Sequence, residues 1–90
     1  MVSAPYRSTP VFDQETLPAA LRANHSTKAG VWGLVRVLEG RLRLTYVVPP
    51  AELELAGGES GLVEPQQDHF VTPLGSVKMC VDFYHEPPER

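Results

Sequence analysis

Apolar and polar residues alternate with a period of two over much of the chain. The alternation is clearest in three segments: 31–38, 41–48 and 77–84. In the last of these, Val77, Met79, Val81 and Phe83 occupy every second position. Successive side chains of a strand point to opposite faces of a sheet, so this pattern predicts strands with one face on a core.

Glycine and proline separate the alternating segments. Gly40 accepts a positive φ without a Cβ clash, so Glu39-Gly40 predicts a hairpin turn between the first two strands. Pro49-Pro50 ends the second strand, and Pro73 with Gly75 predicts another turn. Shorter apolar segments lie at 52–55, 62–63 and 70–71. We therefore expect an all-β fold of six to eight short strands, arranged as a sandwich or small barrel.

The one helical candidate lies near the N-terminus. In residues 14–23, Thr16 is suited to cap a helix and Pro18 to its first turn. We expect a short helix or helical turn around 16–22. Nothing marks a domain linker, so residues 1–90 are interpreted as one domain with a core of about 5–84 and a C-terminal tail of 85–90.

Composition narrows the function classes. The net charge of −3, with scattered basic residues, argues against a nucleic-acid partner. The single cysteine, Cys80, excludes an internal disulfide and a Cys-rich zinc site, and its thiol suits a reducing compartment. It shares a face with Lys78 and Asp82, and we interpret it as an inert small residue. Without a signal peptide or a membrane-length apolar run, we expect a cytoplasmic protein with no membrane partner.

A chain of 90 residues can form only a small hydrophobic core. Domains of this size bury roughly 60–65% of their unfolded surface and are marginally stable alone. An open barrel would also leave edge strands that can pair with a second copy. We therefore expect a homodimer.

Several segments together resemble a known family. They are LPAAL at 17–21, HSTKAGVWG at 25–33, VLEGRL at 37–42 and EPQQDH at 64–69, with YRSTPVF at 6–12 and VDFY at 81–84. In this order and spacing they resemble the small cupin-like domain of YeaR-type proteins and of the front of some tellurite-resistance TehB methyltransferases.

The resemblance implies a single antiparallel cupin-like β-barrel of jelly-roll type, usually without an assigned reaction. The family's association with tellurite and with nitrate or nitrite points to stress response or detoxification. Ninety residues leave no room for the doubly wound fold that S-adenosylmethionine binding needs, so methyl transfer is not implied.

The cupin resemblance also implies a metal site, of which this chain keeps a part. Metal-binding cupins place two histidines and a glutamate in one motif and a further histidine on a later strand. His25 matches the first histidine and His69 the last, but Thr27 stands in place of the second histidine and Gly33 in place of the glutamate. The resemblance therefore implies a weakly held divalent metal on His25 and His69, with zinc favoured over iron, manganese or nickel.

Other residues could support that site. Gln67 is two residues from His69 and shares its face if the segment is extended, while Glu64 would need a bend at Pro65. Lys28 could attract an oxyanion such as a small carboxylate, nitrite or tellurite, although such a lysine is more often a solvated loop charge. We therefore expect a small-molecule or oxyanion ligand as the partner. Trp32 is expected to pack against the helix or to form a pocket wall.

Three functions follow. The favoured one is a small cytoplasmic metal- or small-ligand-binding protein without an assigned reaction. The first alternative is a metal-dependent oxygenase, isomerase or reductase using His25 and His69, against which the missing glutamate argues. The second is a structural dimerisation module with a vestigial pocket, in which both imidazoles simply bond to neighbouring groups. His85 is interpreted as a solvated tail residue.

Overall fold

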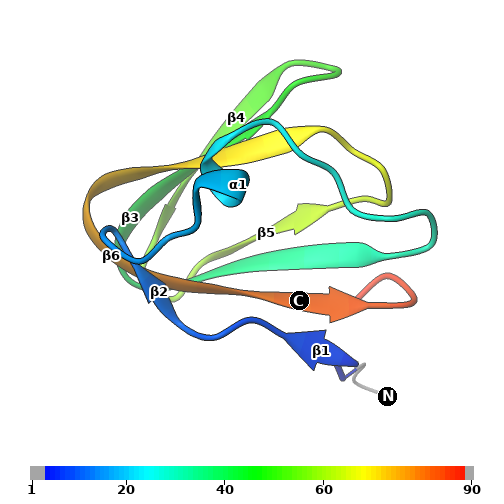
Figure 1. Cartoon of the computed structure of the whole chain (residues 1–90), viewed down its shortest axis with the longest axis horizontal. Coiled ribbons are helices and arrows are strands. Elements are labelled where there is room, and N and C mark those ends of the chain that lie inside the picture. Colours follow the sequence, from blue (N-terminus) through cyan, green and yellow to red (C-terminus); the bar gives the residue numbers. More distant parts are fainter. Residues whose placement is uncertain (1–3, 89–90) are drawn as a thin grey trace.

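Two long strands organise the fold, which a computed structural model describes for residues 4–88 (Figure 1). They are β3 (Trp32–Tyr46) and β6 (His69–Tyr84), and they pair antiparallel from Trp32↔Tyr84 to Tyr46↔His69. The remaining elements in this part of the chain are β1 (Arg7–Ser8), β2 (Phe12–Asp13), α1 (Ala19–Arg22), β4 (Ala51–Ala56) and β5 (Ser60–Val63). The predicted all-β class is confirmed.

Gly40 and Gly75 lie inside the long strands and not in turns between strands. The turns predicted at Glu39-Gly40 and at Pro73 with Gly75 are therefore wrong. β3 continues through Gly40 and β6 continues through Gly75. Two register shifts interrupt their ladder next to Gly40, which has a φ of +78°. A Cβ at Gly40 would lie 1.9 Å from the carbonyl oxygen of Ser76, so the backbones approach too closely for any other residue. The same local sequence suits a reversing turn and a bulged bend, which is why alternation alone did not separate them.

The bends fold one sheet into two facing layers. In one half of β3, Gly33–Arg36 pairs with β5, and in the other half Arg41–Tyr46 pairs with β4. The curved brown part of β6 at the left of Figure 1 joins the two layers. Between the layers lies the apolar core, formed by Leu17, Val35, Val37, Leu42, Leu44, Leu55, Val63, Val71, Val77, Met79 and Val81.

The sheet does not close into a barrel, so this part of the expectation needs correction. Its strand order is β1-β6-β3-β4, with β2 on β6 and β5 on β3. β1 and β4 therefore end that order without pairing with each other. The two-layered, all-antiparallel arrangement remains compatible with a cupin-like fold.

The short helix lies in the predicted range, but Thr16 is not its N-cap. The helix α1 spans four residues, and its N-cap is Pro18, which makes no side-chain capping bond. The Thr16 hydroxyl instead accepts the N–H of Asp13, whose carboxylate accepts the N–H groups of Glu15 and Thr16 at 2.8 Å each. These bonds lower the pKa of Asp13 and close a turn ahead of the helix. In the described part of the chain, no helix has the length and apolar character needed to cross a membrane.

Candidate ligand pocket

A cavity of about 340 Å³ lies between the layers, lined by residues from β1, β3, β5, β6 and the 21–31 segment. This volume is at the small end of the range for small-molecule sites. The apolar part of its lining comes chiefly from Val35, Val63, Val71, Met79, Val81 and Phe83. The polar part includes both histidines that the sequence singled out.

His25 and His69, 44 positions apart in the sequence, lie side by side at this cavity. Each backbone N–H donates to the other residue's carbonyl oxygen at 2.9 Å, which fixes the segment before β3 against the start of β6. Their ring centroids are 4.1 Å apart, with the ring planes tilted by 55°. His69 is 4% exposed, whereas His25 is half-buried.

Both imidazoles are held in one tautomer by backbone carbonyls. Nδ1 of His25 lies 2.9 Å from the carbonyl oxygen of Ala23, and Nδ1 of His69 lies 2.7 Å from that of Gln67. A carbonyl oxygen only accepts, so each Nδ1 carries the proton and donates it. In the neutral rings, each Nε2 therefore keeps a lone pair free for a ligand.

The buried ring stays neutral at physiological pH. Burial lowers the pKa of His69, and the hydrogen bond to the Gln67 carbonyl partly opposes this change. Charge on His25 lowers the same pKa further, while the Asp68 carboxylate raises it. Because the net pKa shift is downward, His69 keeps its Nε2 lone pair at pH 7.

The full cupin metal set does not fit this site. Gly33 lines the cavity without a side chain. The Thr27 hydroxyl donates to the Val31 carbonyl at 2.8 Å and accepts the N–H of Gln66 at 3.2 Å, so it is already committed. Among residues 4–88, no three His, Cys, Asp or Glu side chains gather to hold a metal. The site offers two imidazoles to an ion.

The supporting residues divide into two groups. Lys28 and Thr27 line the cavity, but Gln67, Glu64 and Trp32 do not. The Gln67 side-chain oxygen accepts the Glu64 N–H at 3.0 Å, so residues 64–67 form a turn in which strand parity does not apply. The expected placement of Gln67 beside His69 is therefore wrong. Trp32 precedes Gly33 on β3 and so projects from the opposite face of that strand.

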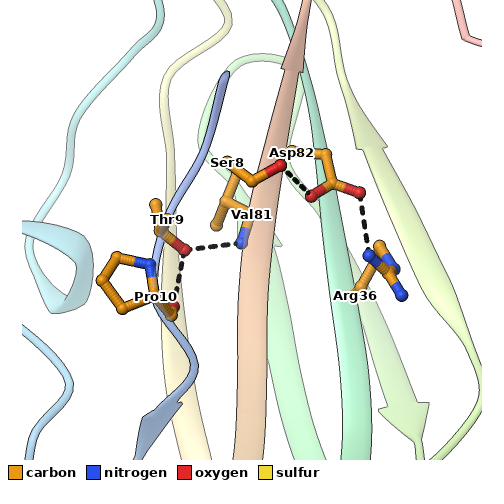
Figure 2. A network of polar contacts seen from close by, with 6 residues as sticks. All are labelled: Ser8, Thr9, Pro10, Arg36, Val81 and Asp82. Atoms are coloured by element: carbon orange, nitrogen blue, oxygen red, sulfur yellow. Dashed lines mark hydrogen bonds and ion pairs between the residues drawn. The ribbon is translucent and has the colours of Figure 1, made fainter. Parts of the chain in front are cut away.

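The sequence pattern missed the contribution of β1 and its two neighbouring residues, which bring Tyr6, Arg7 and Thr9 to the cavity. Figure 2 shows how this short strand is fixed. The Ser8 hydroxyl donates to Asp82 at 2.7 Å, and Arg36 donates to the other oxygen of Asp82 at 3.0 Å. The Thr9 hydroxyl accepts the N–H of Val81 at 2.9 Å. The available signal was Asp82, a carboxylate inside an otherwise apolar strand and only 4% exposed.

Two further residues lie outside the lining. Cys80 is buried on the face of β6 opposite Met79 and Val81, and burial raises the pKa of its thiol. A raised pKa keeps the thiol protonated, which agrees with an inert residue. His85 is exposed, as expected, and its ring stacks on Tyr6 with centroids 3.7 Å apart.

Comparison with known sequences identifies relatives over nearly the whole chain. A family model described as TehB-like domain matches residues 7–81. Two curated proteins from Haemophilus influenzae strains, each described as a probable S-adenosyl-L-methionine-dependent methyltransferase TehB, are 32% and 31% identical over 85 residues. These matches cover 88% of this chain, which spans about 30% of the length of either relative.

Solved structures agree with the fold. The crystal structure of TehB from Haemophilus influenzae superimposes with a TM-score of 0.79 at 29% identity, covering 88% of this chain and 30% of that one. A protein from Escherichia coli K12 matches with a TM-score of 0.81, covering 99% of this chain and 100% of that one; its 22% identity supports the fold alone. Hydroxypropylphosphonic acid epoxidase from S. wedmorenis, 28% identical, has a TM-score of 0.63 over 82% of this chain and 41% of its own.

The family match and the sequence relatives cover the same strands that form the pocket. The match from residue 7 to residue 81 begins at β1 and runs into the second half of β6. The chain therefore belongs to the TehB-like domain family.

Proposed function

We propose that this chain is a cytoplasmic small-ligand-binding module without a reaction of its own, acting in stress response or detoxification. The observation that carries the proposal is the cavity of about 340 Å³ at which His25 and His69 each keep one ring nitrogen free. An apolar cavity with a few convergent polar groups is the usual form of a small-molecule site.

Solved relatives connect this fold with small-molecule binding, in proteins that are themselves named as enzymes. One solved relative of similar fold, hydroxypropylphosphonic acid epoxidase, was crystallised with fosfomycin, so the fold occurs in a protein that binds a small molecule. An oxygenase-type metal centre needs two histidines and a carboxylate. Within residues 4–88 no such trio forms, so the described side chains alone do not make an oxygenase-type metal centre.

A graded series at Gly33 tests the proposal. A Cβ at this position would meet Val63, Thr27 and Val81 at 3.6–3.9 Å, which is ordinary contact, so an alanine fits there. Because Gly33 lines the cavity, a larger side chain should take up space that a ligand would use. We expect a library of small fragments to shift the NMR signals of His25 and His69. The shifts should weaken in Gly33→Ala and vanish in Gly33→Val. Binding that is unchanged in Gly33→Val, or that leaves both histidines unperturbed, would contradict a ligand site in this cavity.

A second candidate ligand is a divalent ion, with zinc favoured. The fixed Nδ1–H tautomers support it, since both free Nε2 atoms suit a metal such as zinc. With two imidazoles and no carboxylate, water would complete the coordination shell, and chelators should remove the ion readily. Elemental analysis of untagged protein before and after dialysis against EDTA, with His69→Ala as the comparison, measures this. Metal content that His69→Ala leaves unchanged would eliminate the candidate.

A further inference from the structure

Only some of the basic side chains in the described part of the chain form ion pairs. Four of the seven Lys and Arg residues in 4–88 form cross-strand ion pairs: Arg36, Arg41, Arg43 and Lys78. Arg7, Arg22 and Lys28 form no ion pair within the described residues, and two of these three, Arg7 and Lys28, line the cavity. Among residues 4–88, most of the basic side chains without an ionic partner therefore lie at the pocket.

The acidic side chains are distributed in the opposite way. The chain has eleven Asp and Glu residues and a net charge of −3, yet the lining contains none of those that the structure describes. Asp68 acts electrostatically on His69 from outside the lining. Within the described structure, this cavity has two cations without an ionic partner and no carboxylate in its lining, which favours a negatively charged ligand.

The rest of the lining limits the size and nature of the anion. The hydroxyls of Thr9 and Thr27 already bond to backbone groups. Arg7, Lys28 and Ser26 remain as donors from exposed positions, while Val35, Val71 and Met79 supply a buried apolar floor. A fully hydrated inorganic oxyanion would leave this floor unused, whereas a ligand with a short hydrocarbon part would cover it.

We infer that the cavity takes a small organic anion, whose charged group meets Arg7 and Lys28 and whose apolar part lies on the valine and methionine floor. This inference rests on the proposed binding function and specifies its ligand class. Arg7 and Lys28 are exposed cations that suit one negatively charged group, and a cavity of about 340 Å³ has room for the short hydrocarbon part of such a ligand.

The test compares two probes of equal shape on the whole chain. Hexanoate and hexanamide differ mainly in charge, and inorganic phosphate supplies charge without a hydrocarbon part. Calorimetry or NMR titration at low ionic strength should give hexanoate an affinity about tenfold higher than that of hexanamide, with phosphate weaker still. Added salt should weaken hexanoate binding and leave hexanamide unchanged, because partly exposed charge pairs are screened.

Matched variants locate the effect. Exposed ion pairs contribute up to about 1 kcal/mol, a factor of about five, so Arg7→Gln and Lys28→Gln should each weaken hexanoate binding by about threefold to fivefold. Together they should remove its advantage over hexanamide. Arg22→Gln is the control, because Arg22 is also without an ion pair in the described structure but lies outside the lining. It should leave both affinities unchanged.

The outcomes separate this inference from the proposed function. Equal binding of hexanoate and hexanamide, lost in Gly33→Val, would refute the anion preference and keep the ligand site. Phosphate binding as tight as hexanoate, or an equal loss in Arg22→Gln, would also refute the inference. If neither organic probe nor any other fragment binds, both the inference and the proposed function fail.

Discussion

Gly40→Ala should be among the most damaging single-methyl additions in this protein. β3 and β6 bend together next to Gly40, where a Cβ would run into the backbone of Ser76 and Val77. An alanine there must adopt a φ of +78°, which costs an L-residue about 1–2 kcal/mol. Its Cβ must also avoid the Ser76 carbonyl oxygen, which would lie only 1.9 Å away.

The second cost exceeds the first. Separation to normal contact moves β3 from β6 by more than 1 Å and breaks ladder hydrogen bonds, each contributing about 1 kcal/mol. Loss of two or more bonds raises the total to about 3–5 kcal/mol. A 90-residue domain has a free energy of unfolding of about 5–13 kcal/mol, so much of its stability would be lost.

Gly30→Ala provides the control for this prediction. Gly30 has almost the same φ, +77°, but a Cβ there would meet no atom within 4 Å. Its substitution should cost about 1 kcal/mol, because the left-handed penalty is partly offset by the lower entropy of the unfolded chain. Urea unfolding at 25 °C followed by circular dichroism measures both. If Gly40→Ala costs no more than Gly30→Ala, the bend does not depend on close backbone approach, and our account of it is wrong.

Further predictions concern pH, the β1 anchor, the metal-binding potential and the assembly. Because the pKa of folded His69 lies below its ordinary value of 6.5, the unfolded chain takes up that proton first. The free energy of unfolding should therefore be insensitive to this group above pH 6.5 and fall as the pH drops below it, and His69→Gln should reduce that fall. Ser8→Ala removes one donor from the buried Asp82 and should cost about 1 kcal/mol, seen as a drop of about 4–8 °C in Tm; an unchanged Tm would mean that the bond does not hold β1. Gly33→Glu adds a carboxylate to the cavity that both imidazoles line and should raise zinc affinity at least about tenfold in calorimetry, whereas Gly33→Ala should not. Sedimentation at micromolar concentration should give twice the 9.9 kDa chain mass, and a stable monomer would refute the expected homodimer.

The strands were predictable because apolar side chains repeat at every second position. Val77, Met79 and Val81 face a core on every second position, and such a pattern has no helical alternative over eight residues. The bends were not predictable in this way, because Gly40 satisfies the local requirements of both a hairpin and a bulge. The choice between them depends on the partner strand, which is more than thirty residues away in the sequence.

The residues of the candidate site were also predictable only in part. The pairing of His25 with His69 followed from the family resemblance, in which both positions carry histidines that face one cavity. Arg7 was missed, because a strand of two residues shows no period and owes its place to Ser8 and Asp82. Gln67 was misplaced, because its parity argument assumed extended backbone where the chain turns.

The state of the two imidazoles tests the central claim most directly. Long-range proton–nitrogen NMR spectra of uniformly labelled protein at pH 7.5 report which nitrogen of His25 and His69 carries the proton. The account predicts a protonated Nδ1 and a free Nε2 in both rings, with both Nε2 signals moving when hexanoate or zinc is added. Protonated Nε2 atoms in the free protein, or signals that neither addition moves, would contradict a ligand site built on this pair.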